Sequence, residues 1–453
     1  MALMPLSDAM FLVPERREQP MHVGALQIFE LPEGAGADWV AALYARWLEA
    51  TEVRALFRRR PERSLRTLGA WNWALDDDVD LEHHVRLSAL PRPGRVRELL
   101  ALVSRLHGTP IDRQRPLWEL HLVEGLEGGR FALYSKLHHA LLDGVAGMRL
   151  LGEVLATEPT EPVPPLWAPR PGPTRDPAPG DLADLPAALV RAAGELAALG
   201  PAVGRRALRF AIEPDRRGLV PPRTILNVPI TGSRRYAAQG WPLEEIRQVA
   251  KAAGGTVNDV VLAMCAAALR AYLLERDALP EDPLIAMTPV ALRGHDGGGE
   301  GGNAVGAILC DLATDVADPA ERLARIRESM GEGKEAMSGL TPLQAAAYSA
   351  LQVAPLALSA VRTLGGLVPQ PFNLVISNVP GPRRTLYLDG ARLTGVYPLS
   401  VPTDGQALNI TCTSYDGSLD FGLTGDRRAL PHLQRLLPHL QAGLDDLAVA
   451  VGA

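Results

Sequence analysis

Two adjacent histidines, His138 and His139, are followed at close spacing by Asp143 and Gly144. An imidazole can take up and return a proton near neutral pH, so a well-placed histidine is the usual general base of an enzyme. A carboxylate shortly after the histidines can orient the site, and a glycine allows the backbone to turn sharply. The combination indicates a proton-transfer site rather than an accident of packing.

The flanking pattern predicts the elements that position these residues. Residues 118–123 alternate between side-chain types as a strand does, and residues 131–139 alternate again after a Glu-Gly-Gly turn. Asp143 then occupies the N-cap position of a helix whose apolar residues are Val145, Met148, Leu151 and Val154. If the second strand continues through both histidines, they point to opposite faces, and only one can be the base in a given cleft. The sequence leaves open which one, and Asp143 could either cap the helix or hold a cation.

Length and composition limit the class of protein. A chain of 453 residues is too long for one ordinary core, so we expect two domains. A hydrophobic content of 47% with 22% charged residues is typical of a well-packed soluble protein, and a net charge of −6 argues against nucleic-acid binding. The three cysteines, Cys265, Cys310 and Cys412, are far apart and odd in number. They predict neither a disulfide framework nor a paired-cysteine metal site, and they fit a reducing cytoplasm.

One break in composition divides the chain. Prolines crowd between residues 158 and 186, and such a stretch can hold neither a helix nor the interior of a sheet. An Ala/Leu-rich segment with several arginines follows and favours an amphipathic helix. We therefore predict an N-terminal subdomain over residues 1–157, a proline-rich crossover linker with this helix over 158–222, and a C-terminal subdomain over 223–453.

The N-terminus lacks the pattern of a secretion signal, so we expect a cytoplasmic protein. The longest uncharged stretch, residues 336–361, is a poor membrane span because it carries Gln344, Ser349, Gln352 and Pro355. It could form two ordinary core helices or lie on the surface of a bilayer.

Other patterns are less specific. A metal site at the histidines is disfavoured because strand neighbours point apart and no Cys/His cluster completes the ligand set. The glycines of residues 297–302 lack the Gly-Lys-Ser/Thr ending of a phosphate-binding loop, which favours a flexible loop. Arg58, Arg59 and Arg60 could meet CoA phosphates or anionic lipid headgroups, although a solvated helix end is the favoured interpretation.

The histidine motif resembles the His-His-x-x-x-Asp-Gly signature of the CoA-dependent acyltransferase superfamily. Further segments make nearly the whole chain similar to one branch, the bacterial wax ester synthase/acyl-CoA:diacylglycerol acyltransferases. These segments are residues 5–12, 20–24, 116–119, 258–263, 289–293 and 377–382. The double-histidine motif alone is specific only to the superfamily. The Asn-Asp and Ser-Asn-Val-Pro-Gly-Pro segments that follow it in this order are specific to the branch.

The resemblance assigns roles to particular residues. It implies that His139, the second histidine, is the general base that removes the acceptor's hydroxyl proton during attack on the acyl-CoA thioester, with His138 beside it. It also implies that Asp143 shapes the site by pairing with an arginine, for which Arg293 is the candidate. Donors for the oxyanion could come from Asn258 or from the groups around Ser377 and Asn378.

Two of these segments also have plain structural explanations. Asn258 and Asp259 could simply begin a helix, or they could contribute to an acyl tunnel or to the architecture of the site. Residues 377–382 would form a turn in either case, and a turn can present backbone donors to a ligand. Residues 116–118 are expected to be structural, with a proline before a strand and a packed indole.

The resemblance also implies the architecture and the substrates. We expect two chloramphenicol-acetyltransferase-like α/β subdomains, each a mixed sheet flanked by helices, with an active-site tunnel at their interface. Acyl-CoA is the expected co-substrate, with no further cofactor and no metal, and the acceptor is a fatty alcohol or a diacylglycerol. Such acceptors partition into lipid, so we expect peripheral association with the inner membrane or with lipid bodies.

Two alternatives to this function stay open. A condensation-type or other lipid acyltransferase would share the motif but would use a carrier-protein thioester. A non-catalytic lipid- or CoA-binding relative would keep only the fold. The sequence does not specify the preferred acceptor, the acyl length, the oligomeric state or the physiological product.

Overall fold

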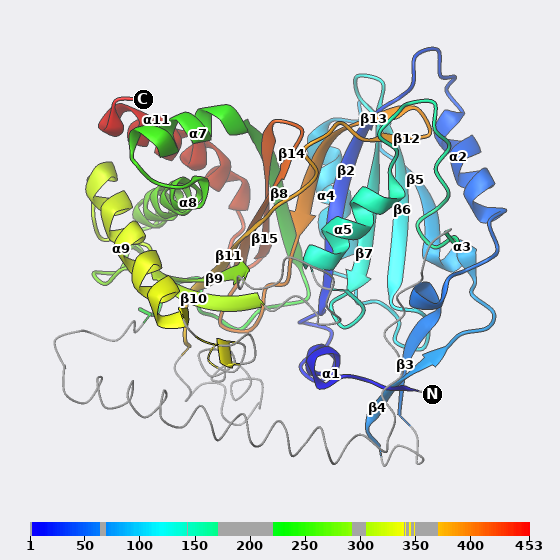
Figure 1. Cartoon of the computed structure of the whole chain (residues 1–453), viewed down its shortest axis with the longest axis horizontal. Helices are drawn as coiled ribbons and strands as arrows, with labels where there is room; N and C mark the ends of the chain where they lie inside the picture. Colours follow the sequence, from blue (N-terminus) through cyan, green and yellow to red (C-terminus); the bar gives the residue numbers. More distant parts are fainter. Residues whose placement is uncertain are drawn as a thin grey trace.

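The computed structural model describes residues 2–63, 69–142, 144–170, 221–291, 305–338, 340, 344–345, 348 and 370–453. Its described residues form two α/β halves side by side, each built on a mixed six-stranded sheet (Figure 1). The predicted fold class is therefore confirmed. Most of the predicted linker and of the uncharged stretch 336–361 lies outside the described residues.

The first sheet carries the histidine motif and has the strand order β12-β13-β2-β7-β6-β5. Its strands are β2 (His22–Glu30), β5 (Val85–Ala89), β6 (Trp118–Leu126), β7 (Arg130–His138), β12 (Tyr387–Leu388) and β13 (Ala391–Leu399). Only β5 and β6 pair in parallel, and all other neighbours in this sheet are antiparallel.

The second sheet has the order β10-β9-β11-β14-β15-β8. Its strands are β8 (Arg234–Pro242), β9 (Ile285–Ala291), β10 (Val305–Asp311), β11 (Leu374–Val379), β14 (Leu408–Tyr415) and β15 (Ser418–Asp426). The central strand β11 runs parallel to both β9 and β14, whereas the outer pairs are antiparallel.

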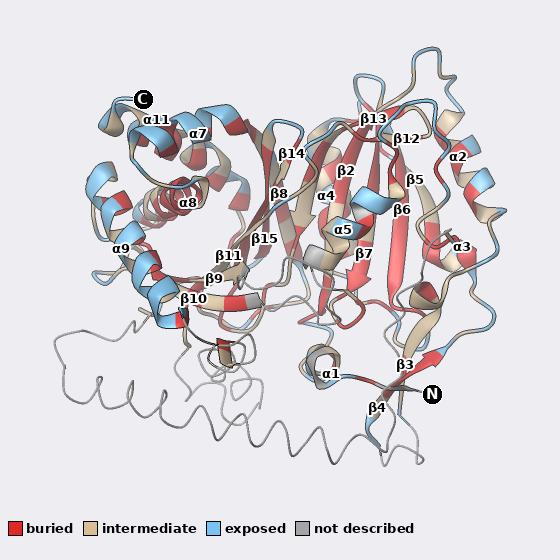
Figure 2. Cartoon of the chain, in the orientation of Figure 1, coloured by how far each residue is buried: buried red, intermediate tan, exposed pale blue. Residues whose placement is uncertain are grey.

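Helices cover both sheets, and a small sheet lies at one end of the first half. The helices are α1 (Leu6–Leu12), α2 (Trp39–Leu48), α3 (Leu81–His84), α4 (Val96–His107), α5 (Gly144–Val154), α7 (Leu243–Ala252), α8 (Val257–Leu274), α9 (Pro319–Met337) and α11 (Leu436–Val451), with short 3-10 turns η1 (Ala55–Arg58) and η4 (Leu433–Arg435). The small sheet contains β1 (Ala2–Leu3), β3 (Arg59–Arg63) and β4 (Trp71–Leu75). Figure 2 shows that the strands are mostly buried, while the outer sides of α2 and α9 are exposed.

Strand β7 illustrates how alternation predicts packing. Its residues Phe131, Leu133 and Leu137 join the core that also contains Leu150 of α5. The intervening Ala132 and Tyr134 belong to a different core, which contains residues of α4. Helices α5 and α4 accordingly lie on opposite faces of the sheet (Figure 1). The predicted alternation of residues 131–137 is confirmed, because successive side chains of a strand face opposite sides.

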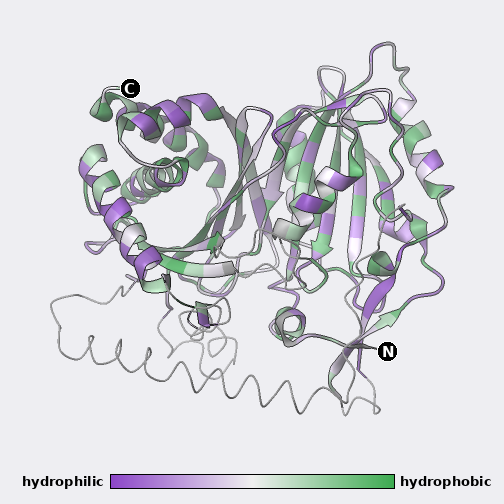
Figure 3. Ribbon diagram, viewed as in Figure 1, coloured by the Kyte–Doolittle hydropathy of each residue, from purple (hydrophilic) through white to green (hydrophobic). Residues whose placement is uncertain are grey.

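Helix α8 is the central helix of the second half. Among the described residues it alone is long and apolar enough to cross a membrane, but 67% of that window is buried inside the protein. It is hydrophobic over most of its length (Figure 3) and packs in the larger core with residues of β14, β15 and α11. Its apolarity is therefore explained by packing.

Strand β13 connects the two halves, although it comes late in the sequence. It pairs with β2 of the first sheet from Arg392 to Leu399, and Val396 N–H donates to the Asp420 carboxylate of β15 at 2.8 Å. The approach is tight: a Cβ on Gly422 of β15 would lie 1.8 Å from the Pro398 carbonyl oxygen. The predicted division of the chain at residue 223 did not anticipate this crossover, because pairing between distant strands leaves no local pattern.

Asp420 should make stability depend on pH. Burial raises its pKa to about 6, although hydrogen bonds from the Ser418 hydroxyl and the Val396 N–H favour the charged form. A carboxyl with a raised folded-state pKa contributes stability that is complete below its unfolded pKa, near 4, and is lost as the pH rises through 6. The sensitive window is therefore about pH 4 to 6.

We expect Asp420→Asn to remove this dependence, because a carboxamide stays neutral and its oxygen can still accept the Val396 N–H. Between about pH 4.5 and pH 8, the unfolding free energy of the wild type should fall by about 2 kcal/mol relative to the variant. Urea titrations at the two pH values measure this difference. Asp416→Asn, at an exposed position of the same hairpin, is the matched control. If Asp416→Asn changed the pH dependence of the unfolding free energy as much as Asp420→Asn does, the dependence could not be assigned to Asp420.

Candidate active site

The two histidines of the motif lie in different surroundings. Strand β7 ends at His138, which pairs across the sheet with His22 of β2. His138 is fully buried, whereas His139 lies in the following turn and is half-buried. The sequence pattern had suggested that the strand continues through both histidines. In the structure it ends at His138. The end of the strand nevertheless directs the two rings to different neighbours.

Both ring nitrogens of His138 have polar neighbours. Its Nδ1 accepts the N–H of Ala140 at 3.0 Å, and its Nε2 lies 3.3 Å from Glu15 Oε1. Since a backbone N–H can only donate, the neutral ring carries its hydrogen on Nε2, which faces the carboxylate. The one lone pair that could accept a proton is thus already used. This arrangement suits a structural role for His138.

Glu15 is the main residue of the site that the sequence analysis missed. Its buried carboxylate accepts from the Arg113 guanidinium and, at 3.0 Å, from the N–H of Met21, besides facing His138. Burial alone would raise its pKa, but the contacts with His138, Met21 and Arg113 outweigh burial and lower it. Glu15 is therefore a buried anion beside His138. No spacing rule links it to a motif more than a hundred residues away.

His139 is held by its backbone and by one aromatic ring. Its N–H donates to the Met21 carbonyl at 2.8 Å, which anchors the turn to the segment before β2. Its imidazole stacks on Phe11 at the end of α1, with 3.9 Å between ring centroids and 14° between planes. A half-buried imidazole is held by the protein on one side and accessible on the other, which suits a general base that must reach a substrate proton.

A layer of buried polar groups continues from His138 along the same face of the sheet. Directly opposed residues of an antiparallel pair share a face, which brings Lys136 beside Glu119 of β6. Lys136 Nζ lies 3.1 Å from Glu119 Oε2, and His121 Nε2 lies 3.3 Å from the same oxygen. His22 points to this face too, and its Nε2 donates to the His107 carbonyl at 2.9 Å. These groups are charge-paired or hydrogen-bonded, as buried polar groups must be.

Two of the predicted site residues, Asp143 and Arg293, lie outside the described residues. Their pairing therefore stays a prediction. Gly144, the residue after Asp143 in the sequence, is the first residue of α5. The predicted helix after the motif is confirmed.

Asp259 has a clear structural function at the start of α8. Its carboxylate accepts the Thr256 N–H at 2.8 Å, while the Thr256 hydroxyl accepts the Asp259 N–H at 3.3 Å. This reciprocal pair is a capping box, and it satisfies two backbone donors of the helix end. Asn258 is half-buried in the same first turn. The helix-start interpretation is thus confirmed for Asp259.

Ser377 and Asn378 are residues of strand β11, which runs to Val379, so the turn predicted over 377–382 is wrong for its first three residues. Asn378 pairs with Cys412 of β14, and the chain leaves the sheet only after Val379. The strand extends beyond its apolar residues because β11 continues to pair with β14 through Val379. Beyond it, Gly381 packs closely: a Cβ there would lie 2.2 Å from the Ser414 carbonyl and 3.2 Å from Met148 Cε of α5. The segment after β11 thus meets the helix that follows the histidines.

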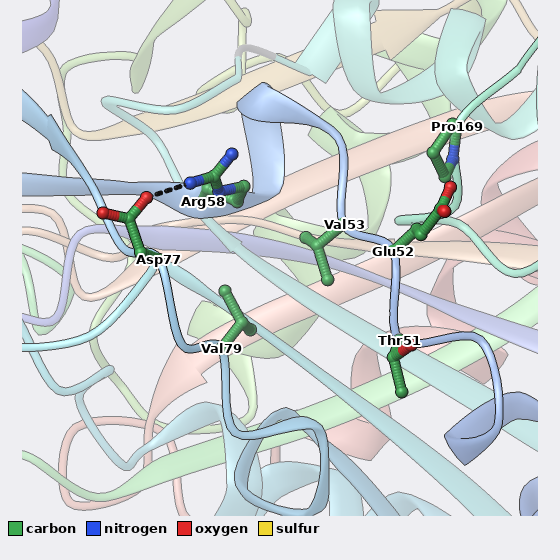
Figure 4. Close-up of a pocket in the computed structure, with 7 residues that line it drawn as sticks. All are labelled: Thr51, Glu52, Val53, Arg58, Asp77, Val79 and Pro169. Carbon is green, nitrogen blue, oxygen red and sulfur yellow. Dashed lines mark hydrogen bonds and ion pairs between the residues drawn. The ribbon is translucent and has the colours of Figure 1, made fainter.

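The arginines near residue 58 make local contacts. Arg58 forms an ion pair with Asp77, and its Nε donates to the Asp76 carbonyl at 2.8 Å. It borders a surface pocket, which Figure 4 shows to be lined by Thr51, Glu52, Val53, Arg58, Asp77, Val79 and Pro169. No residue of the histidine motif that the structure describes lines this pocket. Arg58 therefore binds the neighbouring segment of residues 76–77. These local contacts agree with a structural role for Arg58 rather than with a ligand-binding one.

Comparisons with known proteins agree with this architecture. Protein-family models for the wax ester synthase/diacylglycerol acyltransferase catalytic domain and for the WS/DGAT C-terminal domain match residues 3–261 and 301–448. A Mycobacterium tuberculosis protein named as a probable diacylglycerol O-acyltransferase is 51% identical over 454 residues, which cover 100% of each chain.

Solved structures give the same result. The wax ester synthase/diacylglycerol acyltransferase from Marinobacter aquaeolei VT8 is 44% identical, with a TM-score of 0.81 and 100% of both chains covered. The first condensation domain of the calcium-dependent antibiotic synthetase is 18% identical, with a TM-score of 0.59, 99% of this chain and 96% of that chain covered. Because the sequence identity to the condensation domain is only 18%, this similarity shows a shared fold and nothing more.

Proposed function

This chain belongs to the wax ester synthase/diacylglycerol acyltransferase family, and from that membership we propose that it moves a long-chain fatty acyl group from acyl-CoA to a hydroxyl group. With a fatty alcohol the product is a wax ester, and with a diacylglycerol it is a triacylglycerol. The observation that carries the proposal is the contrast between the two histidines. His138 is fully buried and its Nδ1 accepts the Ala140 N–H, whereas His139 is half-buried in the turn directly after β7, where a substrate hydroxyl can approach its ring.

In the proposed reaction His139 is the general base. It removes the hydroxyl proton of the acceptor while the hydroxyl oxygen attacks the thioester carbonyl. The new C–O bond forms, the C–S bond breaks, and the proton passes from the imidazolium to the departing CoA thiolate. Thiols are far more acidic than alcohols, so the thiolate leaves readily and no covalent enzyme intermediate is needed. Direct transfer in a ternary complex then requires no metal and no cofactor besides the acyl-CoA co-substrate.

The proposal gives the other predicted residues supporting roles. We place Asp143 and Arg293 in an ion pair that shapes the turn after the histidines. For the oxyanion we favour the segment of Ser377 and Asn378, because the turn after β11 packs against α5 through Gly381 and Met148. Acyl-CoA and acceptor would enter a tunnel between the two halves from opposite sides.

We further propose that the protein works at a lipid surface, as a cytoplasmic protein associated peripherally with the inner membrane or with lipid bodies. Fatty alcohols and diacylglycerols partition into lipid, so the enzyme must reach them there. Besides the stretch 336–361, exposed apolar side chains next to the site support this contact. Met10 of α1 is 58% exposed and Val13 is 71% exposed, and Phe11 between them touches His139.

A thiol-release assay tests the reaction and the substrate class together. The purified protein is mixed with acyl-CoA of several chain lengths and with either hexadecanol or a diacylglycerol in detergent micelles. We expect CoA thiol to appear only when donor and acceptor are both present, together with the matching ester. Absence of thiol release under all conditions would favour a non-catalytic lipid-binding protein. Release from a carrier-protein thioester but not from acyl-CoA would favour condensation-type chemistry.

A further inference from the structure

The Phe11 ring stacks on the imidazole of His139. The ring centroids are 3.9 Å apart and the planes differ by only 14°. The face of a phenyl ring attracts a cation that lies within about 6 Å of the ring centroid. A positive charge on the His139 ring would therefore lie within reach of this attraction.

The position of Phe11 is fixed by its neighbours in the chain. Leu12 is buried in the core of the first half, and its carbonyl accepts from Arg113 Nη2 at 2.7 Å. The same guanidinium pairs with Glu15, which in turn contacts His138. The end of α1 is thus attached to the strand that carries the histidines. The backbone next to Phe11 is therefore anchored by Arg113, and the backbone of His139 is anchored by its N–H bond to the Met21 carbonyl.

We propose that Phe11 stabilises the positive charge that develops on His139 during acyl transfer. The inference rests on the proposed function, because it presumes that His139 takes up the proton. As the proton moves to the imidazole, the phenyl face beneath it gains attraction for the ring, and this gain is absent before proton transfer. An interaction that strengthens only at that point lowers the barrier. Phe11 acts through His139 and is therefore a positioning residue.

Charged groups surround this pair and must be held constant in a test. Asp8 precedes Phe11 on α1, Arg113 contacts the Leu12 carbonyl and Glu15, and Glu15 contacts His138, which pairs across the sheet with His22. Asp143 lies outside the described residues. A change confined to the electrons of the Phe11 ring leaves all of these groups in place. Its effect then reports the interaction between the two rings.

Such a change is available through fluorinated phenylalanines at position 11, with one, two and three fluorine atoms on the ring. Fluorine withdraws electrons and weakens the attraction of the ring face for a cation, while shape changes little. We expect kcat to fall stepwise, by about tenfold in total, and the acidic limb of the kcat/KM profile to move to lower pH by about one pH unit. The limb moves down because a less stabilised imidazolium releases its proton more easily.

The same series at Phe421, which packs edge-on against Trp241 in the second half, is the matched control and should leave kcat and the pH profile unchanged. Phe11→Leu should resemble the trifluoro variant, and Phe11→Tyr should restore most of the activity. An unmoved acidic limb, or equal loss in the leucine and tyrosine variants, would overturn the inference in favour of simple packing. Wild-type activity in His139→Ala would instead overturn the proposed function itself.

Discussion

Replacing His139 with asparagine should lower kcat for acyl transfer by about 10²–10⁴-fold, the usual contribution of a general base. The reason is chemical: an amide cannot take the hydroxyl proton of the acceptor. The fold should remain intact, because the backbone N–H of residue 139, which donates to Met21, is kept. Initial rates of thiol release with saturating acyl-CoA and acceptor measure the effect, and circular dichroism checks the fold.

The same substitution at the neighbouring position is the control. No base is needed there, and the carboxamide oxygen that His138→Asn introduces can accept the Ala140 N–H in place of the imidazole Nδ1. The loss of the contact with Glu15 should lower kcat by no more than about tenfold, or about 1.4 kcal/mol. If His138→Asn were the more damaging of the two variants, the roles assigned to the histidines would be reversed.

Replacing Glu119 with glutamine should destabilise the protein by about 3–5 kcal/mol, because it leaves a buried charge without its partner. The partner is Lys136, which is fully buried on β7 with its Nζ 3.1 Å from the carboxylate. Burial would raise the pKa of Glu119, but His121 and Lys136 overcome it and lower the pKa to about 2. The contribution to stability is thus present above the unfolded pKa and is lost only as the pH falls toward 2.

Urea unfolding at neutral pH measures this loss. The double variant Glu119→Leu/Lys136→Met removes both charges and keeps the volume similar, so most of the lost free energy should return. A matched single variant, Glu98→Gln on α4, breaks an ion pair with Arg95 at the surface and should leave the unfolding free energy nearly unchanged. Equal losses in Glu119→Gln and Glu98→Gln would show that the buried pair has no special role.

Local patterns predicted the elements around the motif well. Alternation predicted β6, most of β7 and the two faces of β7, and helical spacing predicted α5. The indole of Trp118 was expected to be packed, and it is buried with its Nε1 donating to the Phe57 carbonyl at 2.8 Å. Each of these features depends on residues close together in the chain. Periodicity and backbone conformation are sufficient to specify them.

Contacts between distant segments could not be predicted from the sequence. Nothing near Phe11 or Glu15 indicates that each touches a different histidine, because the contacts span more than a hundred residues. Strand β13 likewise gives no sign that it completes the sheet of the other half. Ser377 and Asn378 were expected in a turn, but pairing along β11 extends the strand through them. Such outcomes depend on which surfaces meet, and that is decided by the packing of the whole chain.

By itself, the sequence predicted a proton-transfer motif and determined that this motif follows a strand and precedes a helix. The adjacent histidines could not be distinguished at that level, since both have the same chemistry and nearly the same place in the chain. The tertiary structure separated them by their surroundings: His138 is buried with a backbone donor and the Glu15 carboxylate, and His139 lies half-buried against Phe11. Which imidazole can take a proton depends on neighbours that only folding brings together.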